Sequence, residues 1–228
     1  MTSLDRRAFL TVVGAMLVAG CSKTASGDGG VGPVQLPPGG SAEPVPAAIT
    51  SVAVVGDSIT AGSAPAIDAA LRGAGVEDVR IEGATSRRIE VGNGKGDAPK
   101  SGVIAVYELL AEGVDPSVWV IELGTNDVGS YGSPEEYGAL IDAITTMLPP
   151  SKPMVWVNTY REQYLDDTLV FNLVLEQRMT ERGNAVVADW YSVASAPDQT
   201  VLRGDRLHPN ENGQNALALL ILAALAQL

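Results

Sequence analysis

The sequence predicts an α/β fold in which helices cover both faces of a mainly parallel sheet, a three-layer α/β/α sandwich. Two observations lead to this prediction. From residue 49 onward, short segments rich in Val, Ile and Trp alternate with longer helix-like segments. The short segments lack regular apolar–polar alternation, as is typical of parallel strands buried on both faces.

Each element is predicted from its composition and flanking residues. The expected strands are Ser51–Val55, Val79–Glu82, Val118–Leu123, Met154–Asn158 and Ala185–Asp189. The expected helices are Pro65–Arg72, Val103–Ala111, Pro134–Met147, Asp166–Arg182 and about Asn210–Ala226. Ser133 is a favourable N-cap for the third helix, and Pro134 suits its first position. The apolar run that ends the chain has only about a dozen residues, so we expect a packed helix rather than a membrane span.

The composition limits the classes of function. The chain has 228 residues, of which 46% are hydrophobic and 18% are charged, enough for one domain with a full core. The formal net charge of -12 argues against nucleic acid as a partner, because phosphate binding relies on clustered Lys and Arg. No ligand cluster for a metal is recognisable, and no cofactor is expected. We expect a monomer without internal repeats.

Residues 1–21 have the layout of a bacterial export signal. Arg6 and Arg7 precede an apolar run, and small residues precede Cys21. The stretch "DRRAFL" resembles the twin-arginine motif, and "LVAGC" is similar to the lipobox, which implies lipidation of Cys21. An uncleaved anchor, or a cleaved signal with a chance cysteine, is the alternative. Cys21 is the only cysteine, so no intramolecular disulfide can form.

Residues 22–48 are rich in Gly, Pro, Ser and Ala and show no periodicity, which predicts a flexible tether. Residues 49–228 form the folded domain. Together with the signal, this organisation predicts an exported, extracytoplasmic protein that is held at the cell membrane by a lipid on Cys21.

Polar residues gather where the predicted strands end. Ser58 follows the first strand, Gly83 the second and Asn126 the third, while Asp205 and His208 precede the last helix. The carboxyl ends of parallel strands lie at one edge of a sheet, so these residues are expected to converge there.

This set of side chains suits acyl transfer through a serine ester. Ser58 needs a base to take its proton, and His208 is the only histidine in the chain. Asp205 can orient the imidazole. The backbone N–H groups of Ser58 and Gly83, with the Asn126 amide, can stabilise an oxyanion. Each block alone is also explained by an ordinary turn, helix cap or loop residue, and it is their occurrence together, in this order, that favours catalysis.

The order Gly-Asp-Ser, Gly, Gly-x-Asn-Asp and Asp-x-x-His resembles the SGNH (GDSL-type) hydrolase superfamily over about residues 51–226. The resemblance implies a flavodoxin-like sandwich of about five parallel strands. It also implies that Ser58 is the nucleophile, His208 the base and Asp205 the acid, with Gly83 and Asn126 in the oxyanion hole.

The second block departs from the usual family pattern. It reads "GATSRR" without Asn-x-Gly-x-x-Gly, and "TSRR" is more similar to SGNH domains attached to cell-wall acyltransferases. Two solvated loop arginines are the simpler interpretation, and the alternative is that Arg87 or Arg88 lines an acceptor site or contacts an acidic substrate. Asp57, at the first block, is also expected at the substrate pocket.

The stretch "NTYREQY" after the fourth strand faces the same edge. Tyr160, Arg161 and Tyr164 are candidates for a pocket wall, because aromatic faces suit sugar rings and acyl chains. Tyrosines that pack against helices are an equal alternative.

The expected function is a serine esterase that hydrolyses small acyl esters, such as O-acetyl groups on envelope glycans. Two alternatives remain open. An O-acyltransferase would use the same residues to pass the acyl group to a cell-wall sugar. A lipoprotein without activity would bind glycan through a relic cleft.

Overall fold

The structure is a computed structural model that describes residues 32–37, 43–197 and 200–228. The expected signal and Cys21 lie outside these residues. Five parallel strands form one sheet in the order β2-β1-β3-β4-β5. The strands are β1 (Ser51–Gly56), β2 (Asp78–Gly83), β3 (Val118–Glu122), β4 (Met154–Val157) and β5 (Ala185–Ala188). The predicted α/β fold with a parallel sheet is confirmed.

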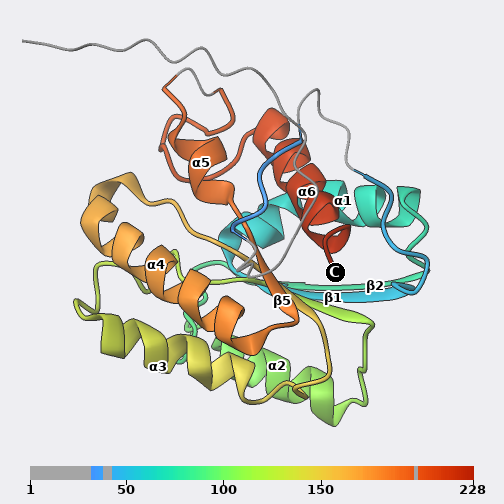
Figure 1. Cartoon of the computed structure of the whole chain (residues 1–228). Coiled ribbons are helices and arrows are strands. Elements are labelled where there is room, and N and C mark those ends of the chain that lie inside the picture. Colours follow the sequence, from blue (N-terminus) through green and yellow to red (C-terminus); the bar gives the residue numbers. More distant parts are fainter. Residues whose placement is uncertain (1–31, 38–42, 198–199) are drawn as a thin grey trace, which may run out of the picture.

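Helices cover both faces of the sheet (Figure 1). They are α1 (Ser58–Gly73), α2 (Gly102–Ala111), α3 (Pro134–Thr145), α4 (Leu165–Arg182), α5 (Trp190–Ser195) and α6 (Glu211–Leu225), with a 3-10 turn η2 (Glu162–Tyr164) before α4. Successive side chains of a strand point to opposite faces. Val52 and Val54 of β1 accordingly pack with α1 and α6, whereas Ala53 and Val55 pack with α2, α3 and α4.

All five strands lie within two residues of their predicted bounds, but α1 begins seven residues before the predicted start at Pro65. The Asp57 carboxylate accepts the Ile59 N–H at 2.8 Å and caps the helix directly after β1. Pro65 therefore lies inside the helix. Helix α5 was not predicted, because its six residues are too few for a periodic pattern to be recognised.

Part of the expected tether contacts the folded domain. The Val34 N–H donates to the Val187 carbonyl at 2.6 Å, and the Val34 carbonyl accepts the Asp189 N–H at 2.8 Å. The Gln35 side chain donates to the Asp189 carboxylate. Residues 32–37 thus lie beside β5, because an edge strand offers unpaired backbone groups.

Helix α6 packs on the sheet as predicted, and Leu217, Leu220 and Ile221 are among its buried residues. Among the helices of residues 32–37, 43–197 and 200–228, none has the length and apolar character that crossing a bilayer requires.

Candidate active site

Three predicted residues from distant parts of the chain lie in one hydrogen-bonded chain. Ser58 is the first residue of α1, directly after the carboxyl end of β1. Its Oγ is 3.0 Å from His208 Nε2. His208 Nδ1 is 2.8 Å from Asp205 Oδ2. The structure therefore brings a hydroxyl, an imidazole and a carboxylate into the order that proton transfer from a serine requires.

The loop before α6 sets the orientation of the imidazole. Asp205 Oδ1 accepts the backbone N–H groups of Leu207 and His208, each at 3.0 Å. The hydrogen bonds from His208 are the main cause that lowers the pKa of Asp205 to about 2, so this carboxylate is ionised. It accepts a hydrogen bond from His208 Nδ1–H, which leaves Nε2 free to accept a hydrogen bond from the Ser58 hydroxyl.

Gly83 ends β2 next to the first turn of α1. The Ala84 N–H donates to the Gly56 carbonyl at 3.2 Å, which holds the end of β2 against the end of β1, directly before Ser58. A Cβ at position 83 would lie 2.5 Å from the backbone nitrogen of Ala61. Only glycine permits this close approach between β2 and the helix that carries Ser58.

The predicted oxyanion residue Asn126 is engaged within the protein. Its side-chain nitrogen donates to Asp57 Oδ2 at 2.9 Å and to the Arg87 carbonyl at 3.0 Å. An amide nitrogen has two hydrogens, so both are used. Asn126 can donate to a substrate oxyanion only when one of these bonds is shared or released.

Two carboxyl groups are buried beneath the first turn of α1. Asp57 is fully buried, and Glu122, the last residue of β3, is 3% exposed. Glu122 Oε2 accepts the Thr60 N–H at 3.1 Å and the Thr60 hydroxyl at 2.9 Å. Burial raises the pKa of Asp57 to about 6, and burial followed by the charge of Asp57 raises the pKa of Glu122. Asp57 therefore does not line an open pocket, contrary to expectation. It holds α1 and Asn126 in place.

Arg87 differs from both expectations for the two arginines. Arg87 is 3% exposed and donates to the carbonyls of Gly56, Glu82 and Lys100. Its guanidinium thus braces the backbone on both sides of the oxyanion region instead of facing solvent or a substrate.

Arg88 pairs with the buried carboxylate of Asp127, at 3.3 Å, and lies over the Tyr131 ring at 5.3 Å. Asp127 also accepts the Ile89 N–H at 3.1 Å. Burial raises the pKa of Asp127 to about 6. This pair joins the loop after β2 to the loop that carries Asn126.

The residues after β4 take different positions. Tyr160 is 6% exposed and packs edge-on against Tyr191, so it belongs to the core. The Arg161 guanidinium lies 4.8 Å from the Tyr164 ring centroid and donates to the Thr125 carbonyl at 2.8 Å. Arg161 also lines a cavity, as expected of a pocket residue.

This cavity, here called the rim cavity, has a volume of about 270 Å³ and adjoins the triad. It is lined by Arg161, Glu162, Gln163, Gly204, Asp205, Arg206 and Leu207. Glu162, Arg206 and the buried Glu122 were not among the predicted site residues. Glu122 could have been noticed in the sequence, because it is a carboxylate at the end of an otherwise apolar strand.

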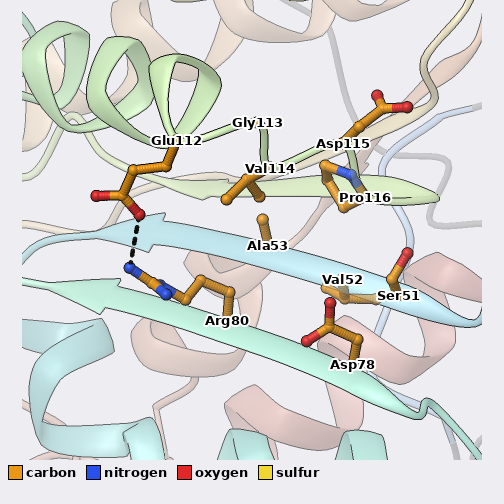
Figure 2. A pocket seen from close by; sticks show the side chains of 10 residues that line it. All are labelled: Ser51, Val52, Ala53, Asp78, Arg80, Glu112, Gly113, Val114, Asp115 and Pro116. Atoms are coloured by element: carbon orange, nitrogen blue, oxygen red, sulfur yellow. Dashed lines mark hydrogen bonds and ion pairs between the residues drawn. The ribbon is translucent and has the colours of Figure 1, made fainter.

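A second cavity, of about 390 Å³, lies at the amino ends of β1 and β2 (Figure 2). Arg80 and Glu112 form an ion pair of 3.1 Å across it. None of the predicted site residues lines it. The predicted residues Ser58, Gly83 and Asn126 lie instead at the opposite edge of the sheet, where the strands end. In the part of the chain that the structure describes, no group of three or more His, Cys, Asp or Glu is arranged to hold a metal ion.

The comparisons with known proteins agree with this fold. Residues 54–216 match the model of the GDSL-like Lipase/Acylhydrolase family. No curated protein sequence matches the chain. The fold is similar to that of the C-terminal catalytic domain of Streptococcus pneumoniae peptidoglycan O-acetyltransferase A, with 21% identity and a TM-score of 0.61 over 78% of this chain and 94% of that chain.

Two further solved structures share the fold. TesA is 18% identical with a TM-score of 0.63, and covers 78% of this chain and 98% of its own. The family 3 carbohydrate esterase of Clostridium thermocellum is 19% identical with a TM-score of 0.56, over 78% of this chain and 98% of that chain.

Proposed function

Because the chain belongs to the GDSL-like lipase/acylhydrolase family, we propose that it is a serine esterase that hydrolyses small acyl esters. The observation that supports this most directly is the hydrogen-bonded chain from Ser58 through His208 to Asp205, with distances of 3.0 and 2.8 Å. A nucleophile, a base and an orienting carboxylate are the groups that ester hydrolysis through an acyl-enzyme requires.

The geometry supports a two-step mechanism. In the first step, His208 takes the proton of Ser58 while Oγ attacks the ester carbonyl carbon, and the imidazolium then returns the proton to the departing alcohol oxygen. In the second step, water attacks the acyl-serine through the same base, which releases the acid and restores the Ser58 hydroxyl. Asp205 stays ionised and stabilises the imidazolium.

The N–H groups of Ser58 and Gly83 stabilise the oxyanion. The position of Ser58 at the start of α1 adds the favourable field of the helix N-terminus. Asn126 contributes a third donor when it releases one of its hydrogen bonds to Asp57 or Arg87.

The substrates that we propose are acetyl esters on envelope glycans, and the site of action is outside the cytoplasm. The similarity of fold to a carbohydrate esterase and to a peptidoglycan O-acetyltransferase supports the substrate class. The export-like residues 1–21 and Cys21 support the location and a lipid anchor.

Replacement of the nucleophile tests the proposal. We expect Ser58→Ala to lower kcat/KM for p-nitrophenyl acetate by about 10³-fold or more, with an unchanged Tm. Ser151→Ala is the matched control, because Ser151 is exposed and lies before β4, at the far end of the sheet. Retained activity in Ser58→Ala would contradict the assignment. A wild-type protein whose Ser58 resists a fluorophosphonate probe would instead favour the non-catalytic glycan binder.

An O-acyltransferase is the second candidate, favoured by the similarity of fold to peptidoglycan O-acetyltransferase A. It shares the first step, after which a sugar hydroxyl replaces water. Incubation with an activated acetyl donor and a glycan distinguishes the two, because mass spectrometry then detects either free acetate alone or acetylated glycan.

A further inference from the structure

The rim cavity lies between two segments that are far apart in the sequence. One wall is the turn after β4 with Arg161, Glu162 and Gln163, and the other is the loop 204–207. Two of the loop residues are close to His208 in this loop: Leu207 directly precedes it, and Asp205 hydrogen-bonds its Nδ1 at 2.8 Å. The cavity therefore adjoins the imidazole side of the triad.

The two walls are joined by an ion pair. Arg206 Nε lies 2.6 Å from Glu162 Oε2. Arg206 has a backbone φ of 56°, in the left-handed region that side chains with a Cβ rarely adopt. On the opposite wall, Arg161 is held by the Thr125 carbonyl and the Tyr164 ring. Three side chains of the lining, Arg161, Glu162 and Arg206, thus have partners within the protein, and those of Arg206 and Glu162 remain 63% and 46% exposed.

The chemistry of the first step decides which part of an ester lies here. His208 gives its proton to the departing alcohol oxygen as the bond from that oxygen to the acyl carbon breaks and the acyl group stays on Ser58 Oγ. The alcohol part must therefore lie on the imidazole side, whereas the carbonyl oxygen points toward Gly83. A cavity beside the loop that carries His208 is therefore a candidate for the alcohol side.

The lining of the cavity combines hydrogen-bonding groups with apolar surface, as a site for a sugar ring does. Two arginines are balanced by Glu162 and Asp205, so the lining has no net charge and does not favour an anion. The Gln163 amide can both donate and accept, as a sugar hydroxyl does. Leu207 and the aliphatic parts of the arginine side chains can contact the C–H groups of the ring.

We propose that the rim cavity is the subsite for the alcohol part of the substrate and that it takes a single sugar ring. The inference rests on the proposed esterase function and specifies the substrate side of the same site. It assigns recognition of the sugar to Gln163, Arg206 and Glu162.

Filling the cavity tests the inference. A Cβ at Gly204 would meet no atom within 4 Å, so Gly204→Trp adds a large side chain to the lining without a clash at its base. Gly73→Trp is the matched control, because Gly73 has the same free space at the end of α1, away from the active edge. Gln163→Ala removes hydrogen-bonding groups without filling the space.

Two substrates with the same acyl group separate the outcomes: a methyl O-acetylglucoside, and vinyl acetate, whose alcohol is too small to fill the cavity. We expect Gly204→Trp to lower kcat/KM for the acetylated glucoside about tenfold or more, and Gln163→Ala to lower it about three- to tenfold. In both variants the loss on the acetylated glucoside should exceed any loss on vinyl acetate by these factors, and Gly73→Trp should resemble wild type with both substrates.

Several results would overturn the inference. Equal losses on both substrates, or no loss on either in Gly204→Trp and Gln163→Ala, would show that the cavity does not hold the sugar. A selective loss on vinyl hexanoate would place the acyl chain there instead.

Binding to the inactive Ser58→Ala protein gives a readout that does not depend on activity. NMR saturation transfer to methyl glucoside should be observed in Ser58→Ala and be lost when Gly204→Trp is added. A wild-type protein that is inactive on vinyl acetate contradicts the proposed function, and the binding result still decides the subsite.

Discussion

The two sides of the proposed active site are built differently. On the nucleophile side, Asp57 is fully buried and Arg87 is 3% exposed. On the acid–base side, the side chains of His208 and Asp205 are 32% and 48% exposed. The first side is held by groups from β1, β2 and β3, whereas the second is held by hydrogen bonds within one short loop.

This difference matches the separate tasks of the two sides. Oxyanion donors act through a fixed position, because donors that must reorganise during the reaction lose much of their effect. A base that delivers a proton to the alcohol has to remain accessible to that alcohol. We therefore expect substitutions on the buried side to lower both stability and activity, and those on the exposed side to lower activity alone.

Gly83→Ala should have the largest effect on stability. The added Cβ would lie 2.5 Å from the Ala61 nitrogen and 2.7 Å from its Cα, and this backbone cannot move without displacing α1. We expect the free energy of unfolding to fall by about 2–3 kcal/mol, with a loss of esterase activity. Urea unfolding and p-nitrophenyl acetate hydrolysis measure the two effects. Gly73→Ala, where a Cβ meets nothing, is the control, and a stable, active Gly83→Ala would disprove the close packing.

Arg87→Met should have the second-largest effect on stability. It removes a buried guanidinium that donates to the carbonyls of Gly56, Glu82 and Lys100. We expect a loss of about 2 kcal/mol in unfolding free energy and a lower kcat. Arg80→Met is the matched control, since Arg80 is half-exposed and pairs only with Glu112. Equal stability of the two variants would show that Arg87 does not brace the site.

Asp127→Asn tests the buried nucleophile side through the pH dependence of the free energy of unfolding. The pKa of Asp127 is raised from 3.8 to about 6 in the folded protein, mainly by burial. The folded state therefore binds more protons than the unfolded state between pH 4 and 6, and stability falls as the pH rises through this range.

The neutral amide has no such titration and can still accept the Ile89 N–H. We expect the loss of unfolding free energy between pH 4 and pH 7 to be smaller in Asp127→Asn, by about 1–2 kcal/mol. Unfolding curves at both pH values measure this difference. If the loss of unfolding free energy is the same in Asp127→Asn and wild type, Asp127 is not its cause.

Asp205→Asn should have the smallest effect on stability. Its carboxylate is half-exposed and its partners lie within its own loop, so we expect a change below about 0.5 kcal/mol. The kcat for ester hydrolysis should nevertheless fall strongly, because the amide favours the wrong imidazole tautomer. A large loss of stability here would remove the contrast between the two sides.

The sequence predicted those features that depend on local pattern. Buried apolar runs marked the strands, and a single histidine with a nearby aspartate marked His208 and Asp205. The burial of Arg87 could not be predicted, because its carbonyl partners at positions 56, 82 and 100 come together only in the folded chain. The same holds for the ion pair between Arg206 and Glu162, which lie 44 positions apart.

The contact of Val34 with β5 affects how the protein should be produced and how far it can extend. A recombinant chain that begins near residue 48 would leave the β5 edge unpaired, which invites edge-to-edge aggregation. Starting at or before residue 32 would keep this edge covered.

In the full chain, residues 22–31 alone separate Cys21 from the docked segment. Ten residues span at most about 35 Å, so a lipid on Cys21 would keep the enzyme close to the bilayer surface.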